Sequence, residues 1–301
     1  MIKATTREKI AGYLFILPLL VYTGVFLIAP AVMSLFFSMT QWNMRTQPIW
    51  IGIENYKELV FNHLKYPYFG HSFWITIKYT LMAVPMGIGS GFCLALLINS
   101  VKREKIESFF KVAFYLPVIT SSVAVAAIWK WIYDSRYGLL NIFLAKLGFE
   151  GQNWLGDART ALFALAVLAM WGCGVTMIIY LAGLKGISPQ FYEAAKIDGA
   201  SALDLFWYIT LPLLRPVTFF LTVTGVIASF QIFEIIYVLY GAGGGSYGGP
   251  NNSTLTYIMY LYNHAFRYGE MGVACAMSFI LFILILILTI LQFKILPQSY
   301  D

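Results

Sequence analysis

The sequence predicts an all-α integral membrane protein with six transmembrane helices. The first observation behind this prediction is composition. Of the 301 residues, 59% are hydrophobic and only 11% are charged, and the mean hydropathy is +0.73. A soluble domain has about 25% charged residues, so this chain lacks the groups that cover a surface in water. The second observation is a set of apolar segments, each long enough to cross a bilayer as a helix of about 20 residues.

The predicted spans follow one another along the whole chain, and residues 1–301 are expected to form a single transmembrane domain. The first span is too long for the apolar core of a signal peptide and lacks a small-x-small cleavage pattern, so we interpret it as a retained anchor. In the second span, Gly87 and Gly91 form a GxxxG spacing, which predicts a face where another helix packs closely. The spans cover roughly residues 11–38, 73–99, 109–133, 161–184, 216–240 and 271–293.

Lys and Arg are unevenly distributed between the connections, and the net charge is +6. Because short cytoplasmic loops carry an excess of these residues, the distribution predicts that both termini and residues 185–215 face the cytoplasm. The opposite connections are longer and hold most of the remaining Lys and Arg. The predicted cytoplasmic set is Lys3, Arg7, Lys9, Lys102, Arg103, Lys105, Lys111, Lys185, Lys196, Arg215 and Lys294.

Two of the opposite connections have recognisable local patterns. In "ENYKELVFNHL", the residues Tyr56, Leu59, Val60 and Leu64 recur near helical spacing, which predicts a short helix on the outer face. The stretch "GAGGGSYGGPNNST" is predicted to be a flexible loop. It is not a phosphate-binding loop, because no GK[ST] follows the glycines and no strand precedes them.

No side chains are grouped in a way that indicates catalysis or metal binding. The three cysteines are scattered through apolar segments, and the three histidines lie in polar connections without the spacing of metal ligands. A membrane-embedded enzyme is therefore a weak interpretation.

Residues 188–216 stand out because they are polar and contain clear helix boundaries. Ser188 and Pro189 predict a helix start, with a hydroxyl cap before a proline at the first helical position. Gly199 predicts the end of that helix, since glycine tolerates a left-handed turn. Ser201 and Asp204 have the spacing of a capping box, which starts a second helix. The second helix has apolar residues at Ala202, Leu205, Phe206 and Ile209, and Pro212 and Pro216 bend the chain into the next span.

Two capped helices are more than a simple connection requires. The first of them carries Phe191 and Tyr192 next to the acidic residues Glu193 and Asp198. A rigid element with a mixed apolar and acidic surface favours a docking role over an ordinary solvated loop.

The same stretch resembles the EAA loop of the membrane subunits of ABC importers. Glu193-Ala194-Ala195 is followed at the family's spacing by Gly199, Ile209 and Leu211-Pro212. The resemblance is closest to the carbohydrate-uptake group, which includes maltose importers. Further matching pieces lie in the same order along nearly the whole chain: "WIGIENY" at 50–56, "YLPVITSSVAVAAIWKWIYD" at 115–134, "MIIYLAGLKGIS" at 177–188, and "GGPNNST" and "HAF" before the last span.

This resemblance implies a type I ABC importer permease fold, with a MetI-like core over residues 73–293 that includes the 185–215 coupling loop. It implies that the loop contacts a cytoplasmic ATPase through Glu193, Ala194, Ala195, Asp198 and Gly199. The chain has no Walker A sequence, so we expect it to bind no cofactor itself, with ATP and Mg used by the partner ATPase.

The resemblance also implies the other partners and the location. We expect a second homologous permease subunit, two ATPase subunits, an extracytoplasmic solute-binding lipoprotein and a sugar substrate, all at a prokaryotic cytoplasmic membrane. The chain departs from the best-known maltose importer subunit in lacking a large inserted outer domain. The sequence leaves open whether the solute is a mono-, di- or oligosaccharide, a polyol or a glycerol phosphate.

Polar side chains inside predicted spans are candidates for the substrate site, because they are costly in lipid and usually face the bundle interior. They are Ser122, Thr176, Gln231 and Glu234, with Trp171 as the ring expected to stack on a sugar. Alternative interpretations stay open at this stage. Ser122 and Thr176 can bond back to their own helix, and Glu234 can pair with Lys130.

The main alternative function is an ion-gradient-driven secondary transporter. Such proteins usually have more spans, internal repeats or carboxylate relays inside the membrane. This chain has no convincing internal repeat, and Glu234 is the one carboxylate well inside a predicted span.

Overall fold

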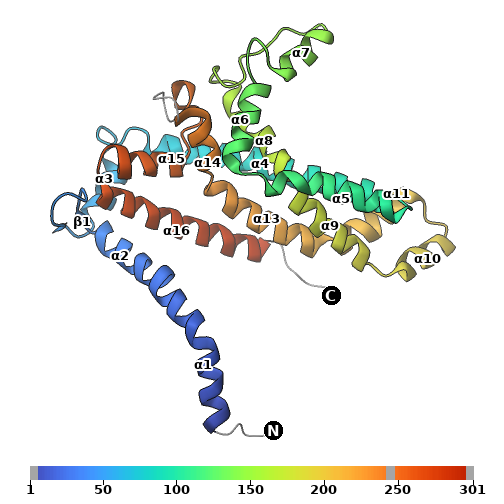
Figure 1. Ribbon diagram of the computed structural model, residues 1–301, viewed down its shortest axis with the longest axis horizontal. Helices are drawn as coiled ribbons and strands as arrows, with labels where there is room; N and C mark the ends of the chain where they lie inside the picture. The colour runs from blue at the N-terminus through green and yellow to red at the C-terminus, as the bar shows by residue number, and fades with distance from the viewer. Residues whose placement is uncertain (1–5, 242–247, 296–301) are drawn as a thin grey trace. The chain divides into compact units, whose positions relative to one another are not determined.

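A computed structural model describes residues 6–241 and 248–295, and these residues are mostly helical (Figure 1). Three helical runs are long and apolar enough to cross a membrane unbroken: Ala11–Ser38, Phe69–Asn99 and Met271–Ile295. Three more candidates are pairs of helices bent at a break. The count within the described residues reaches six when each bent pair is one span, which matches the predicted number of spans. The fifth candidate is Ala202–Leu213 with Arg215–Phe230, bent by 57°, and so begins earlier than the predicted span at 216–240. Part of the predicted glycine-rich loop and the predicted cytoplasmic residue Lys3 lie outside the described residues.

The chain divides into two compact units, and unit 1 comprises Met1–Pro67 with Leu261–Ile283. Its elements are α1 (Thr6–Thr23), a π-helical segment (Gly24–Ile28), α2 (Ala29–Ser38), β1 (Thr40–Gln41), β2 (Ile49–Trp50), α3 (Glu54–Phe61), a second π-helical segment (Asn263–Arg267) and the first part of α16 (Met271–Ile295). The two strands are antiparallel, with Thr40 opposite Trp50. The short helix predicted within residues 54–64 is present as α3, and its Leu59 is fully buried. The helix ends at Phe61, so the predicted apolar residue Leu64 lies beyond it and is 98% exposed.

Unit 1 is held together at the strand pair. The Asn55 side-chain amide donates to the carbonyls of Ser38 and Thr40, at 2.8 and 2.9 Å. Gly272, in the first turn of α16, lies against the same strand. A Cβ atom there would meet the Thr40 carbonyl oxygen at 2.0 Å. Glycine is therefore required for this close approach of backbone to backbone.

Unit 2 comprises Tyr68–Tyr260 with Leu284–Asp301. Its elements are α4 (Phe69–Asn99), α5 (Glu104–Ile119), α6 (Ser122–Ile132), α7 (Leu139–Lys146), α8 (Ala161–Ala169), a 3-10 turn (Met170–Gly172), α9 (Gly174–Gly186), α10 (Pro189–Ile197), α11 (Ala202–Leu205), a π-helical segment (Phe206–Thr210), α12 (Leu211–Leu213), α13 (Arg215–Phe230), α14 (Glu234–Ile236), a π-helical segment (Tyr237–Gly241), a 3-10 turn (Pro250–Asn252) and α15 (Tyr257–Tyr262), which runs on into unit 1.

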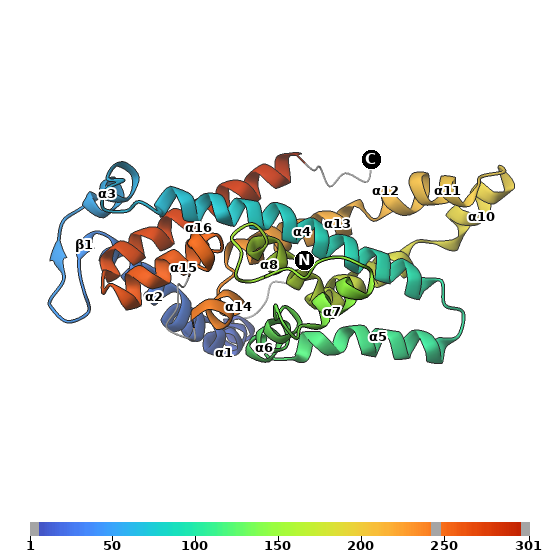
Figure 2. The same ribbon diagram turned by 90° about the horizontal axis from the view of Figure 1, so that it is seen from above.

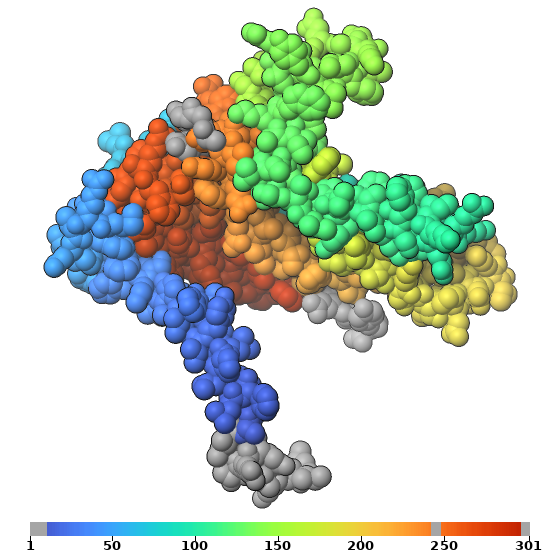
Figure 3. All heavy atoms as spheres, in the orientation of Figure 1, coloured from blue at the N-terminus to red at the C-terminus, as the bar shows by residue number. Residues whose placement is uncertain are grey.

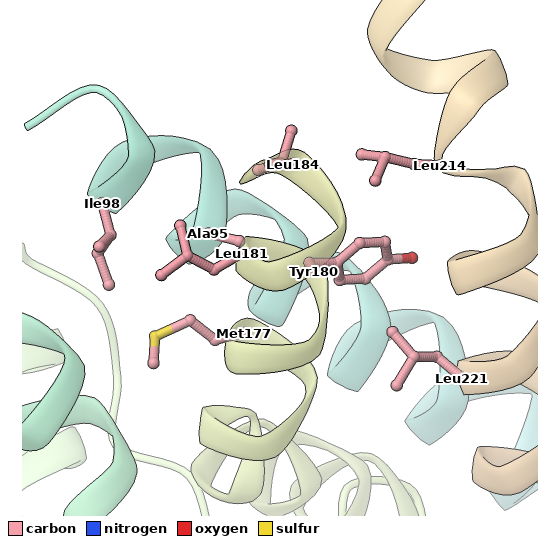
Figure 4. Packing of buried hydrophobic residues seen from close by; sticks show 8 residues of the cluster. All are labelled: Ala95, Ile98, Met177, Tyr180, Leu181, Leu184, Leu214 and Leu221. Carbon is pink, nitrogen blue, oxygen red and sulfur yellow. The ribbon is translucent and has the colours of Figure 1, made fainter. Parts of the chain in front are cut away.

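The long helix α4 is the centre of unit 2, since it packs against α8, α9 and α13. A cluster of buried hydrophobic residues in this core joins α4, α9 and the beginning of α13 (Figure 4). The Tyr180 hydroxyl of α9 is bonded to the Thr218 hydroxyl of α13 at 3.0 Å. The buried side chains of the cluster are Ala95, Ile98, Met177, Tyr180, Leu181, Leu184, Leu214 and Leu221.

The predicted small-residue face of the second span is confirmed as a packing face. A Cβ atom on Gly91 would lie 2.5 Å from the Thr176 methyl carbon and 3.0 Å from the Met177 backbone nitrogen. Helix α9 therefore touches the backbone of α4 at this point. Small residues allow such approaches in lipid, where packing rather than water exclusion holds helices together.

We expect Gly91→Val to destabilise unit 2 by about 1–3 kcal/mol, the usual cost of overpacking a tight contact. The thermal unfolding of the purified protein in detergent measures this effect. Gly89→Val is the matched control, because a Cβ atom on Gly89 has no neighbour within 4 Å. Equal stability of the two variants would contradict the assignment of Gly91 to the α4–α9 contact.

The third, fourth and fifth predicted spans were expected to be continuous, and this expectation was wrong. Helices α5 and α6 are bent by 99°, and the helices Ala161–Gly172 and Gly174–Gly186 are bent by 49°. Thr120 and Ser121 are extended between α5 and α6, and the Ser121 hydroxyl accepts a hydrogen bond from the Val123 backbone nitrogen. Helix α13 ends at Phe230, ten residues before the predicted end of the span, and the chain is irregular at Phe233. Hydropathy averaged over the length of a span could not reveal the breaks, because each segment as a whole stays apolar enough to be read as one span.

Candidate functional site

The polar stretch forms a compact hairpin, which we define as residues 188–210 and call the α10–α11 hairpin. It lies at the same end of unit 2 as the beginning of α5 (Figure 2). Pro189 occupies the first turn of α10 as predicted, although the Ser188 side chain makes no capping hydrogen bond. The predicted capping box at the start of α11 is confirmed, with Ser201 and Asp204 bonded reciprocally.

The turn between the two helices depends on Gly199, whose φ is +83°. The Gly199 nitrogen donates to the Lys196 carbonyl at 3.1 Å, and the Ala200 nitrogen donates to the Ala195 carbonyl at 2.9 Å. These two bonds form a Schellman motif, the helix ending in which a left-handed residue satisfies the last free carbonyls. The predicted glycine elbow is therefore confirmed.

One side-chain bond closes the hairpin on itself. The Tyr192 hydroxyl of α10 lies 3.0 Å from the hydroxyl of Thr210, a buried residue. Thr210 also donates to the Leu205 carbonyl at 3.2 Å. The two arms are thus fixed to each other, and the hairpin can act as one rigid element.

The outer surface of the hairpin is apolar and exposed. Ile197 is 87% exposed, and Phe191, Leu203, Trp207 and Tyr208 are also exposed. The atoms of α10 form the yellow tip of unit 2 in Figure 3. Large apolar side chains gathered on an exposed surface are typical of a protein-binding site.

All the residues predicted to contact the ATPase lie on α10 or directly after it. Glu193, Ala194, Asp198 and Gly199 are exposed, and Ala195 is half-buried. The structure therefore brings these residues together on an accessible surface of the hairpin.

Three helix breaks of unit 2 meet around a cavity of about 240 Å³, which we call the Trp171 cavity. Thr120 and Ser122 line it from the α5–α6 break, Trp171 and Gly172 from the break between α8 and α9, and Ile232 from the break after α13. Irregular backbone at membrane depth occurs where it lines a cavity, and broken helices often form substrate sites in transporters.

A second cavity of about 520 Å³, the Thr176 cavity, adjoins the first. Tyr79, Ala169 and Ile232 line both cavities. The remaining walls of the Thr176 cavity come from α4, α9 and α13, with Thr176 and Thr224 among them. The two cavities are therefore neighbouring parts of one surface of unit 2.

The structure brings three of the predicted substrate residues to these cavities: Ser122 and Trp171 to the first, and Thr176 to the second. Within the described part of the chain, the hydroxyls of Ser122 and Thr176 make no hydrogen bond back to their helices, whereas Thr224 bonds to the Phe220 carbonyl at 2.8 Å. The Ser122 and Thr176 hydroxyls thus remain available to a solute.

The other two predicted substrate residues lie elsewhere. Gln231 and Glu234 are exposed at the break after α13, and neither lines either cavity. In the described residues, no ion pair joins Glu234 to Lys130, the pairing that the sequence left open. A role for Gln231 and Glu234 in substrate binding stays a prediction.

Sequence reasoning missed Tyr79 and Thr120 as cavity residues. Tyr79 lies within a long apolar helix, where a tyrosine resembles any core aromatic residue. Thr120 lies in the unpredicted break between α5 and α6, and its hydroxyl donates to the Pro117 carbonyl at 2.7 Å.

The cavity walls are uncharged. Among the described residues that line the two cavities, none is Asp, Glu, Lys, Arg or His. Hydroxyls, aromatic rings and aliphatic side chains suit a neutral, hydroxylated solute better than an ion.

Comparison with known proteins agrees with the resemblance found in the sequence. The sequence profile of the family described as "Binding-protein-dependent transport system inner membrane component" matches residues 83–298. The probable ABC transporter permease protein YesP of Bacillus subtilis is 35% identical over 97% of this chain and 92% of its own length. The arabinooligosaccharides transport system permease protein AraP of the same organism is 34% identical over 96% of this chain and 89% of its own.

Among solved structures, a chain of a bacterial ABC transporter that imports the acidic polysaccharide alginate has the same fold. Its TM-score to this chain is 0.82, with 21% sequence identity and coverage of 98% of both chains.

Proposed function

Because this chain belongs to the family of binding-protein-dependent transport system inner membrane components, we propose that it is the permease subunit of an ATP-driven importer for a sugar or oligosaccharide. Its fold is that of ABC importer permeases, as predicted. The chain is a transport component embedded in the membrane. Transport then proceeds by alternating access, with the solute path at the interface with a second, homologous permease subunit.

The observation that carries this proposal is the α10–α11 hairpin. It is rigid, exposed and apolar, and it lies on a chain that has no Walker A sequence of its own. In an ATP-driven importer, a subunit that does not hydrolyse ATP needs a surface that contacts the ATPase subunit. We assign this role to the hairpin, with Glu193, Ala194, Ala195, Asp198 and Gly199 as the contact residues. ATP and Mg are bound by two partner ATPase subunits, and this chain binds no cofactor.

The substrate class follows from the cavities and from the relatives. The uncharged walls around Trp171, Ser122 and Thr176 favour a neutral saccharide over an ion, which counts against an ion-gradient-driven transporter. A relative that covers nearly the whole chain is named for arabinooligosaccharides. An extracytoplasmic solute-binding protein delivers the sugar.

Uptake into proteoliposomes tests the function. The chain is reconstituted with its partner subunits and its binding protein, and labelled arabinotriose and maltose are offered outside with ATP inside. We expect ATP-dependent uptake of at least one neutral saccharide that also requires the binding protein. Uptake that follows an imposed ion gradient and ignores ATP would contradict the proposal.

We expect the hairpin to face the cytoplasm. Leu203 is exposed and lies outside the capping box, so Leu203→Cys offers a reactive thiol without removing a cap. In a variant whose native Cys93, Cys173 and Cys275 are serines, an impermeant maleimide added to intact cells should not label this thiol until the membrane is permeabilised. Leu64→Cys, on the predicted outer side, is the matched control and should be labelled in intact cells. Labelling of Leu203→Cys from outside would reverse the proposed orientation.

A further inference from the structure

One carboxylate of α5 contacts the end of α9, where the chain enters the α10–α11 hairpin. Oε1 of Glu107 pairs with the ammonium group of Lys185, in the last turn of α9. The same oxygen pairs with Lys111, one turn further along α5, at 2.5 Å. The Glu107 side chain is 13% exposed, whereas the Lys185 side chain is 50% exposed, so only the carboxylate side of the pair is shielded from water. Partly buried pairs are screened less by salt than exposed ones.

At their other ends, α5 and α9 are also in close contact. A Cβ atom on Gly174 would lie 2.4 Å from the Phe114 carbonyl oxygen and 3.0 Å from the Tyr115 Cα atom. The first turn of α9 therefore rests directly on the backbone of α5. With the pairing of Glu107 and Lys185, the two antiparallel helices are joined near both ends of their contact.

These two helices connect the hairpin with the Trp171 cavity. Helix α5 has 16 residues and is about 24 Å long at 1.5 Å per residue. Glu107 lies near one end, and Thr120, which lines the cavity, follows the other. Helix α9 likewise runs from the break at Trp171 and Gly172 to Lys185.

We propose that Glu107 is a positioning residue for coupling, which joins α5 to the root of the α10–α11 hairpin so that both helices move with it. A displacement of the hairpin then reaches the cavity through α5 as well as through α9. Without the Glu107–Lys185 pair, a displacement of the hairpin moves α9 but is not transmitted to α5. This inference rests on the proposed function of the hairpin.

Charge reversal tests the proposal in the reconstituted transporter. We expect Glu107→Lys to lower both uptake and the ATPase stimulation by sugar-loaded binding protein about tenfold, within the usual range of coupling between distant sites. The ATPase subunits should still co-purify, because the hairpin surface is unchanged. Glu107→Lys combined with Lys185→Glu restores an opposite-charge pair and should return both rates to within about twofold of the wild type.

Lys111→Ala is the matched control, because it removes the partner of Glu107 within α5 and leaves the link to α9. It should change uptake less than about twofold, as is usual for an ion pair between neighbouring turns of one helix. If Glu107→Lys fails to insert, Glu107→Gln is measured in its place, with the same direction of effect expected. Undiminished uptake in Glu107→Lys, or in Glu107→Gln where it is measured instead, would overturn the proposal. A double variant that assembles but does not recover uptake would also overturn it. If Gly199→Val loses coupling while the Glu107 variants transport normally, the proposed function of the hairpin stands and only the proposed role of Glu107 is refuted.

Discussion

Gly199→Val should lower uptake by at least about tenfold while the protein still inserts into the membrane. Gly199 has a φ of +83°, and a left-handed backbone costs a residue with a Cβ atom about 1–2 kcal/mol. A β-branched side chain is disfavoured further there. The Schellman turn is then replaced by another conformation, and α10 and α11 no longer present one surface to the ATPase. ATPase stimulation by sugar-loaded binding protein should fall together with uptake.

Gly199→Asn separates backbone strain from other effects of a side chain. A Cβ atom at this position has no neighbour within 4 Å, so added volume alone causes no clash. Asparagine adopts the left-handed conformation more readily than valine does, and this variant should retain most of the uptake. Equal loss in both variants would indicate that the surface at Gly199, rather than the turn, is essential. Normal uptake in Gly199→Val would refute the coupling role of the turn.

Trp171→Ala should raise the sugar concentration needed for half-maximal uptake by about tenfold, equivalent to roughly 1.4 kcal/mol. The ring lines the Trp171 cavity at the break between α8 and α9, and it is partly exposed. An aromatic face provides the flat apolar surface that the C–H groups of a sugar need, and stacking contacts are worth amounts of this size. The ATPase rate without binding protein should not change, because α10 and α11 are untouched.

The neighbouring ring provides the control for Trp171. Trp129 meets Trp171 edge-on, with ring centroids 5.7 Å apart, but it does not line the cavity. Trp129→Ala therefore removes the same packing contact without removing the cavity surface. If both alanine variants weaken uptake equally, the effect of Trp171 is one of packing and the sugar does not stack on its ring.

The α10–α11 hairpin could be predicted in detail because its structure depends on local chemistry. Gly199, Ser201 and Asp204 act through hydrogen bonds to residues at most a few positions away, and such patterns are visible in a sequence. The GxxxG face was equally predictable, although the sequence could not name α9 as the helix that Gly91 contacts.

The cavities could be predicted only in part. Ser122, Trp171 and Thr176 were found because polar or aromatic residues are conspicuous in apolar spans. Their common feature is that they lie at or near helix breaks, and hydropathy does not locate these breaks. Tyr79 was missed because only the packing of α4 shows that it lines both cavities.

If the solute passes the two cavities as proposed, their uncharged walls have a consequence for the response of transport to the membrane potential. Moving one elementary charge across the bilayer at a potential of 100 mV changes its free energy by roughly 2.3 kcal/mol. A neutral sugar passing the uncharged residues described here carries no charge through the field. On this proposal the potential neither drives nor opposes the passage of the sugar, and nucleotide hydrolysis by the partner ATPases supplies the work of accumulation. We therefore expect a cell whose membrane is depolarised to continue to accumulate the sugar for as long as its ATP lasts.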